Sequence, residues 1–167
     1  GEICFNTSLE GYLEIITDPS YAGQIVALTY PQIGNYGVAL ADAQAAHPAL
    51  RGLVVADLCA EPSNWRSDLS LGEYLRIEGV IGIEGIDTRA LVRRIRSTGA
   101  QAAVISTTDL DPESLRAKAQ AAPSIAGENI VRSASCETPR RFAPDVRAHA
   151  FAQAPASPAR HRVVAYH

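Results

Sequence analysis

With 167 residues, of which 47% are hydrophobic and 20% charged, the sequence has the composition of a soluble globular protein with one domain and room for a tail. Its net charge of −3 and isoelectric point near 5.8 argue against the basic surface that nucleic-acid-binding proteins usually carry. No apolar run reaches the roughly 18 residues that a membrane-spanning helix needs, and no signal peptide opens the chain. We therefore expect a cytoplasmic protein without nucleic-acid or membrane partners.

The chain has no methionine, and its three cysteines, Cys4, Cys59 and Cys136, lie far apart. The missing initiator indicates a processed chain or a segment of a longer one. An odd number of cysteines without a C-x-x-C pair favours a reducing compartment over a disulfide framework. Each cysteine is interpreted as a small buried hydrophobic residue, because free cysteines are usually buried. None has a histidine and a carboxylate close to it in sequence, so none is expected to be a nucleophile.

Hydrophobic periodicity and turn residues predict four elements in the first half of the chain. In order, they are a strand at 2–5, a helix over 9–16, a strand at 24–30 and a strand at 53–56. Asp18-Pro19-Ser20 ends the helix, because a residue followed by proline disfavours the helical conformation and Asp and Ser favour turns. Residues 34–37, Gly-Asn-Tyr-Gly, have the composition of a tight turn.

In the second half of the sequence, the same signals predict five more elements. They are a helix over 69–77, a strand at 80–83, a helix from Asp87 to Gly99, a strand at 102–106 and a helix over 111–122. Asp87 is expected to accept hydrogen bonds from the free amides of its helix, and Gly99 to end that helix. Because strands alternate with helices, we expect an α/β or mixed domain over residues 1–136.

The composition changes after residue 136. Prolines stand among Ala and Arg without periodicity, which predicts a linker over 137–162. Residues 163–167 then resemble the start of a hydrophobic strand. A lone strand after a linker indicates the beginning of a second domain.

Two groups of residues between 79 and 96, the glycines and the arginines, each have two possible roles. The spacing G-x-x-G-x-x-G over 79–85, with a strand between, favours close backbone packing over a dinucleotide-binding loop. Arg89, Arg93, Arg94 and Arg96 indicate either a solvated helix face or a docking surface for another chain. The four histidines have no metal-ligand spacing, so we expect no metal site.

Three blocks of polar and turn residues make the sequence distinctive. They comprise residues 5–21 with 24–38, residues 63–66 with 70–75, and residues 85–91 with 99–101. In this order they closely resemble the N-terminal domain of the small, glutamine-using chain of carbamoyl-phosphate synthases. The resemblance covers about residues 2–136.

The resemblance implies a swivelling β/β/α-type domain at 1–136 that lacks the family's opening hairpin, then the linker, and at 163–167 the first strand of a truncated class I glutaminase domain. In that family the small chain hydrolyses L-glutamine and passes ammonia to a large chain, which makes carbamoyl phosphate from bicarbonate and ATP. The expected partners are therefore the large chain and L-glutamine. No cofactor is expected in this chain, since ATP and magnesium belong to the large chain. Either arginine or pyrimidine synthesis is compatible with the sequence.

Ser20 is the one site residue that the resemblance implies. It stands in the family's Asp-Pro-Ser-Tyr turn, which helps bind glutamine across the boundary with the glutaminase domain. A hydroxyl both donates and accepts, which suits the ammonium or carboxylate of an amino acid. The local alternative is a serine that closes the turn on its own backbone.

No catalytic residue is assigned. The family's Cys, His and Glu lie in the glutaminase domain, and Cys4, Cys59 and Cys136 match none of its catalytic motif, so the chain alone is expected to be inactive. Its expected role is to dock on the large chain and to wall one side of the glutamine site. The sequence departs from the family at Ala56, where a basic residue is common, and at His167, where Asp is expected. The rival interpretation is a stand-alone interaction module.

Overall fold

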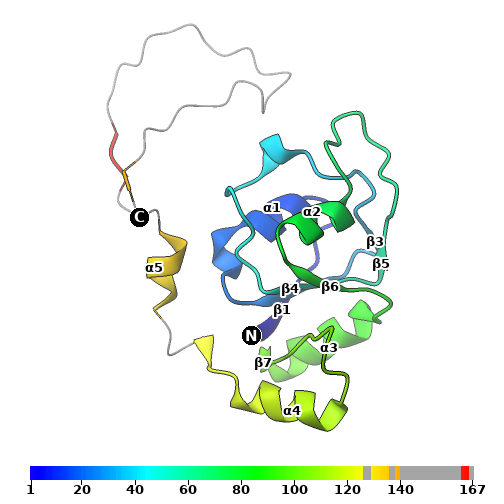
Figure 1. Cartoon of the computed structure of the whole chain (residues 1–167), viewed down its shortest axis with the longest axis vertical. Helices are drawn as coiled ribbons and strands as arrows, with labels where there is room; N and C mark the ends of the chain where they lie inside the picture. Colours follow the sequence, from blue (N-terminus) through cyan, green and yellow to red (C-terminus); the bar gives the residue numbers. More distant parts are fainter. Residues whose placement is uncertain (126–128, 136–137, 140–162, 166–167) are drawn as a thin grey trace, which may run out of the picture.

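The computed structural model describes residues 1–125, 129–135, 138–139 and 163–165. A five-stranded sheet of order β6-β4-β2-β1-β7 lies in the middle of the domain (Figure 1). Its strands are β1 (Glu2–Asn6), β2 (Ile25–Leu28), β4 (Gly52–Val54), β6 (Ile81–Ile83) and β7 (Gln101–Ala102). The first four are parallel, and β7 pairs antiparallel with β1 at one edge. This confirms the expected α/β class.

The register of the sheet sorts its side chains between two cores. Cys4, Val26 and Leu53 are partners in one row, and Ile3 and Ile25 are partners in the next. Because successive side chains of a strand point to opposite faces, the two rows face opposite sides. Both faces of the sheet are therefore covered by other parts of the domain. Because the central strands then contribute side chains to a core on each face, their sequences are nearly continuous apolar runs.

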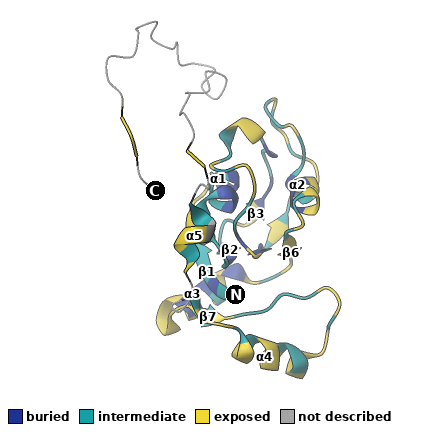
Figure 2. Ribbon diagram, turned by 60° about the vertical axis from the view of Figure 1, so that its left-hand side comes forward, coloured by how far each residue is buried: buried dark blue, intermediate teal, exposed yellow. Residues whose placement is uncertain are grey.

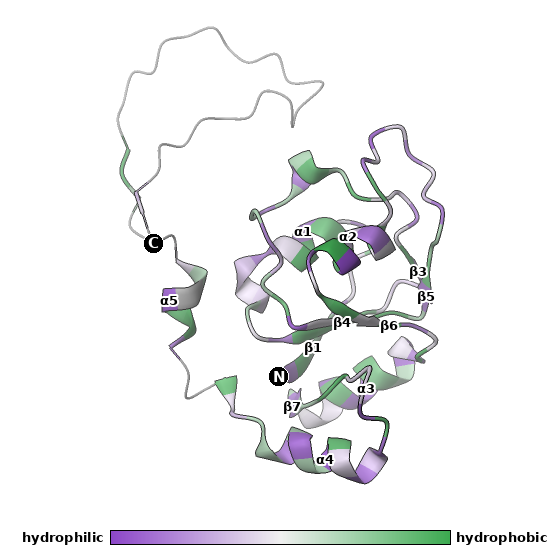
Figure 3. Ribbon diagram, viewed as in Figure 1, coloured by the Kyte–Doolittle hydropathy of each residue, from purple (hydrophilic) through white to green (hydrophobic). Residues whose placement is uncertain are grey.

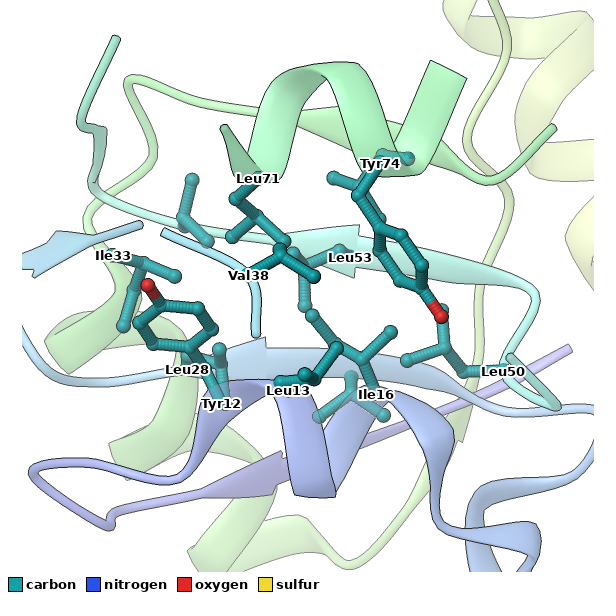
Figure 4. Packing of buried hydrophobic residues seen from close by; sticks show 13 residues of the cluster. Tyr12, Leu13, Ile16, Leu28, Ile33, Val38, Leu50, Leu53, Leu71 and Tyr74 are labelled. Atoms are coloured by element: carbon teal, nitrogen blue, oxygen red, sulfur yellow. The ribbon is translucent and has the colours of Figure 1, made fainter. Parts of the chain in front are cut away.

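Helices α1 (Tyr12–Thr17) and α2 (Leu71–Ile77) cover one face of the sheet. Their buried side chains meet Val26, Leu28 and Leu53 in the larger core (Figure 4). A second sheet of two parallel strands, β3 (Gln32–Ile33) and β5 (Asp57–Leu58), borders the same core through Ile33. These two-residue strands are too short for a sequence pattern to predict.

Helix α3 (Thr88–Thr98) covers the opposite face. Val92 and Ile95 pack against Ile25 and Val54 in the smaller core, and hydrophobic and hydrophilic residues alternate along the helix (Figure 3). The predicted caps are confirmed: Asp87 Oδ1 accepts a hydrogen bond from the backbone N–H of Ala90 at 2.8 Å, and the helix ends before Gly99. The cap and the apolar stripe explain why this helix was predicted almost to the residue.

Two further helices follow the sheet. The predicted α4 (Pro112–Ala121) begins after Asp111, whose carboxylate accepts from the N–H of Glu113, and it has no buried residue (Figure 2). The short helix α5 (Ile130–Ala134) was not predicted. None of the helices in the described ranges is both long and apolar enough to cross a membrane.

Two element boundaries predicted from the sequence are wrong by more than two residues. Helix α1 begins at Tyr12, not at Leu9, because Gly11 has a left-handed backbone (φ +81°) that interrupts the helix, and Leu9 is 74% exposed. Strand β7 comprises two residues, Gln101–Ala102, whereas a strand over residues 102–106 was predicted. Its antiparallel register pairs Glu2 with Ala102, so the residues after 103 pass beyond the start of β1 and find no partner there.

The predicted strand at 163–167 is not confirmed. Residues 163–165 have no regular structure, and Val163 and Val164 are 86% and 68% exposed. Residues 166–167, and almost all of the predicted linker, lie outside the described residues. The domain division and the swivelling β/β/α arrangement therefore stay predictions.

Candidate ligand-binding turn

The connection between α1 and β2 is a tight turn that carries Ser20. Asp18 caps a single 3-10 turn, Pro19–Tyr21, by accepting a hydrogen bond at its Oδ1 from the backbone N–H of Ser20 at 2.8 Å. Pro19 occupies the first position, where its restricted φ fits the turn and its missing N–H costs nothing. The turn is thus closed by the residue before the proline.

The Ser20 hydroxyl takes no part in closing this turn. The residue is exposed, and its hydroxyl makes no hydrogen bond with any residue that the structure describes. Asp18 performs the local role that a serine would otherwise perform. The hydroxyl is therefore available as both donor and acceptor to a molecule outside the domain.

The turn is held on both sides by hydrogen bonds to other elements. On one side, the Tyr21 hydroxyl accepts from Nδ2 of Asn6, the last residue of β1, at 3.0 Å. On the other, the buried Thr17 hydroxyl donates to the carbonyl of Leu13 at 2.8 Å and accepts from the N–H of Gln44 at 2.9 Å. Ser20 is consequently presented from a fixed position.

A pair of tyrosines fixes the other end of α1. The Tyr36 hydroxyl accepts hydrogen bonds from the backbone N–H groups of Gly11 and Tyr12, at 2.6 and 3.1 Å. The Tyr12 hydroxyl donates to the carbonyl of Gly37 at 2.6 Å, and the two rings stack with centroids 4.1 Å apart. Since Gly11 has no side chain with which to cap the helix, Tyr36 supplies the cap from 25 residues away.

Burial raises the pKa of both tyrosines above the ordinary value for the phenol. Both hydroxyls therefore stay protonated at physiological pH, and the Tyr12 hydroxyl remains a donor. Sequence reasoning missed this pair. The available signal was the absence of a capping side chain before an apolar helix, together with a tyrosine inside a Gly-Asn-Tyr-Gly turn.

The described cysteines and histidines form no catalytic or metal-binding cluster. Burial raises the pKa of the Cys4 thiol to about 11, which disfavours the nucleophilic thiolate. The Cys59 thiol donates to the carbonyl of Glu61, and Cys136 lies outside the described residues. At the surface, His47 Nδ1 lies 3.0 Å from Glu78 Oε2. Within the described ranges, no three His, Cys, Asp or Glu side chains are placed to hold a metal ion.

The prediction of close backbone packing is wrong for Gly79 and Gly85, the two outer glycines of 79–85. Gly82 lies within β6, whereas Gly79 and Gly85 flank that strand with left-handed backbones, at φ +69° and +78°. No atom lies within 4 Å of a Cβ added at either flanking position, so these two glycines are required by backbone conformation. They form no continuous loop that could cradle a phosphate.

Comparisons with known proteins agree with the sequence resemblance. The family described as "Carbamoyl-phosphate synthase small chain, CPSase domain" matches residues 1–105. The carbamoyl phosphate synthase small chain of Syntrophotalea carbinolica is 50% identical and covers 99% of this chain. Those of Maridesulfovibrio salexigens and Rhodopirellula baltica are 51% and 54% identical over 83% and 79% of the chain. The chain spans 44%, 37% and 34% of the length of these three relatives, respectively.

Proposed function

The chain belongs to the carbamoyl-phosphate synthase small-chain family, and we propose that it acts as the N-terminal domain of the chain that supplies ammonia from glutamine. The complete enzyme would make carbamoyl phosphate from that ammonia, bicarbonate and ATP. In this role the domain docks on the large chain and lines one side of the glutamine site. The residues that hydrolyse glutamine belong to a glutaminase domain.

The observation that carries the glutamine-site proposal is the exposed Ser20 hydroxyl on its anchored turn. Asp18 closes the turn, and Tyr21 and Thr17 tie its surroundings to β1 and to the loop at Gln44. A hydroxyl that is held in place but unused within the described part of the domain is suited to bind a ligand at a domain boundary. The ammonium or carboxylate of glutamine is such a ligand.

The docking proposal is supported by two observations: the relatives of this chain are named as small chains of a synthase, and no nucleophile is assigned among the residues that the structure describes. Hydrolysis of an amide by covalent catalysis requires an activated nucleophile, and the half-buried Cys4 thiol has a pKa of about 11. A domain with no nucleophile assigned among its described residues can contribute to an enzyme by positioning and binding. Membership of the family favours this role over the stand-alone interaction module.

Size-exclusion chromatography with the cognate large chain tests the docking proposal. A stable interface buries on the order of 1,200–2,000 Å², so the two chains should co-elute at micromolar concentration. The chain alone should release no ammonia from glutamine above a heat-inactivated control. Separate elution of a chain whose circular dichroism shows that it is folded would contradict the proposal. So would glutamine hydrolysis that Cys4→Ser abolishes.

A further inference from the structure

A cavity of about 470 Å³ lies where the parallel strands end. Thr7 follows β1, Thr29 follows β2 and Ala56 follows β4, and all three line it together with the first turns of α3. In open parallel sheets, ligands bind outside the carboxyl ends of the strands. The volume lies within the range of about 300–1,000 Å³ that small-molecule sites occupy.

Three arginines of α3 line this cavity. Arg89, Arg93 and Arg96 stand at positions i, i+4 and i+7, which places them on one stripe of the helix. That stripe lies beside the buried stripe of Val92 and Ile95. All three are exposed to solvent in this domain, which is compatible with both a solvated face and a docking surface. The three arginines therefore border one specific cavity.

The positive charge of this stripe is not neutralised within the described part of the chain. None of the three guanidinium groups forms an ion pair with a described residue, and Arg96 instead lies over the Phe5 ring at 5.5 Å from its centroid. Asp87 is the one carboxylate among the lining residues, and its Oδ1 already accepts from Ala90. Like charges four residues apart destabilise a helix, so the arrangement has a cost unless an anion accompanies it.

We propose that this cavity binds a small anion that carries a phosphate or carboxylate group. The planar fork of donors on arginine matches both groups in a bidentate geometry. Thr7 and Thr29 line the wall that comes from the strand ends; the Thr7 hydroxyl can add a neutral donor, whereas the Thr29 hydroxyl donates to the carbonyl of Asn6 at 3.5 Å. Concave walls from several elements and the volume of the cavity favour a small molecule over a flat protein partner. The site is separate from Ser20, which does not line it, and the inference does not depend on the proposed function.

Titration of the full chain with inorganic phosphate, and separately with acetate, at low ionic strength tests this site. Chemical shifts of the backbone amides should change at Thr7, Thr29 and Thr88 in wild type. A charge-assisted hydrogen bond contributes about 1.5–3 kcal/mol, so Arg93→Gln should weaken phosphate binding on the order of 10- to 150-fold. Arg89→Gln provides a second variant of the same stripe.

Arg94→Gln is the matched control, because Arg94 is exposed on the same helix but does not line the cavity. It should leave the affinity for phosphate within about twofold of wild type. Equal weakening by Arg93→Gln and Arg94→Gln would show non-specific attraction and overturn the proposal. The absence of amide shifts at the strand ends would also overturn it. Loss of large-chain binding in Arg93→Gln, in a chain that binds neither anion, would assign the arginines to protein docking instead.

Discussion

Replacing Tyr36 with phenylalanine should destabilise the domain by removing the cap of α1 while keeping the stacked ring. The Tyr36 hydroxyl is the acceptor for the N–H groups of Gly11 and Tyr12, and Tyr12 is only 2% exposed. Leaving a buried donor unsatisfied costs about 1–3 kcal/mol, and loss of a helix cap costs about 0.5–2 kcal/mol. Because both values describe the same loss, we expect a decrease of about 1–3 kcal/mol in the free energy of unfolding.

Urea unfolding measures this change, with Tyr30→Phe as the control. Tyr30 packs at the edge of the same core, but its hydroxyl makes no hydrogen bond with a described residue. The control should therefore stay within about 0.5 kcal/mol of wild type. For a domain of this size, Tyr36→Phe should lower Tm by about 2–4 °C for each kcal/mol lost, without changing the urea m-value. If both variants were equally stable, the Tyr36 cap would have no energetic role.

Two further predictions follow from shifted pKa values. The side-chain hydrogen bond from Lys118, and a smaller contribution from that of Ser114, lower the pKa of Asp109 from 3.8 to about 2. The stabilisation is therefore complete above about pH 5 and is lost as the pH falls through 2. The difference in unfolding free energy between wild type and Asp109→Asn should therefore shrink between pH 5 and pH 2, and a constant difference would refute this reasoning. Burial raises the pKa of Cys4 to about 11, so roughly one thiol in a thousand is ionised at pH 8. Iodoacetamide alkylation of Cys4, measured by mass spectrometry against Cys4→Ser, should accelerate about tenfold for each pH unit up to pH 10, whereas a plateau below pH 9 would contradict the raised pKa.

Helices with local signals were predictable from the sequence. Asp87 and Asp111 cap α3 and α4, and Ser70 and Glu73 form a capping box at the start of α2. These signals lie within a few residues of the helices that they begin. The start of α1 was misplaced because its cap comes from Tyr36, which is distant in sequence. Strands β3 and β5 were missed because pairing, and not composition, defines two-residue strands.

Each candidate site also has a part that was predictable from local sequence and a part that only the fold reveals. The Asp-Pro-Ser-Tyr turn was recognisable from sequence, but either Asp18 or Ser20 could have closed it, and only the three-dimensional arrangement shows that Asp18 does. The arginine stripe was visible at helical spacing. Its cavity was not, because Thr7, Thr29 and Ala56 come from three strand ends that the sheet brings together. Residues that meet through topology leave no local pattern in the sequence.

Ser20→Ala in the enzyme assembled from the complete small chain and the large chain tests the central proposal most directly. If the hydroxyl binds glutamine, a lost hydrogen bond to a charged group should lower glutamine-dependent kcat/KM on the order of 10- to 150-fold. The loss should appear mainly in KM if the contact is equally strong in the ground and transition states. Ammonia-dependent synthesis should be unchanged, and so should both activities in Ser8→Ala, which removes another exposed hydroxyl. Unchanged glutamine kinetics in Ser20→Ala, or an equal loss of both activities, would contradict the proposed role of Ser20.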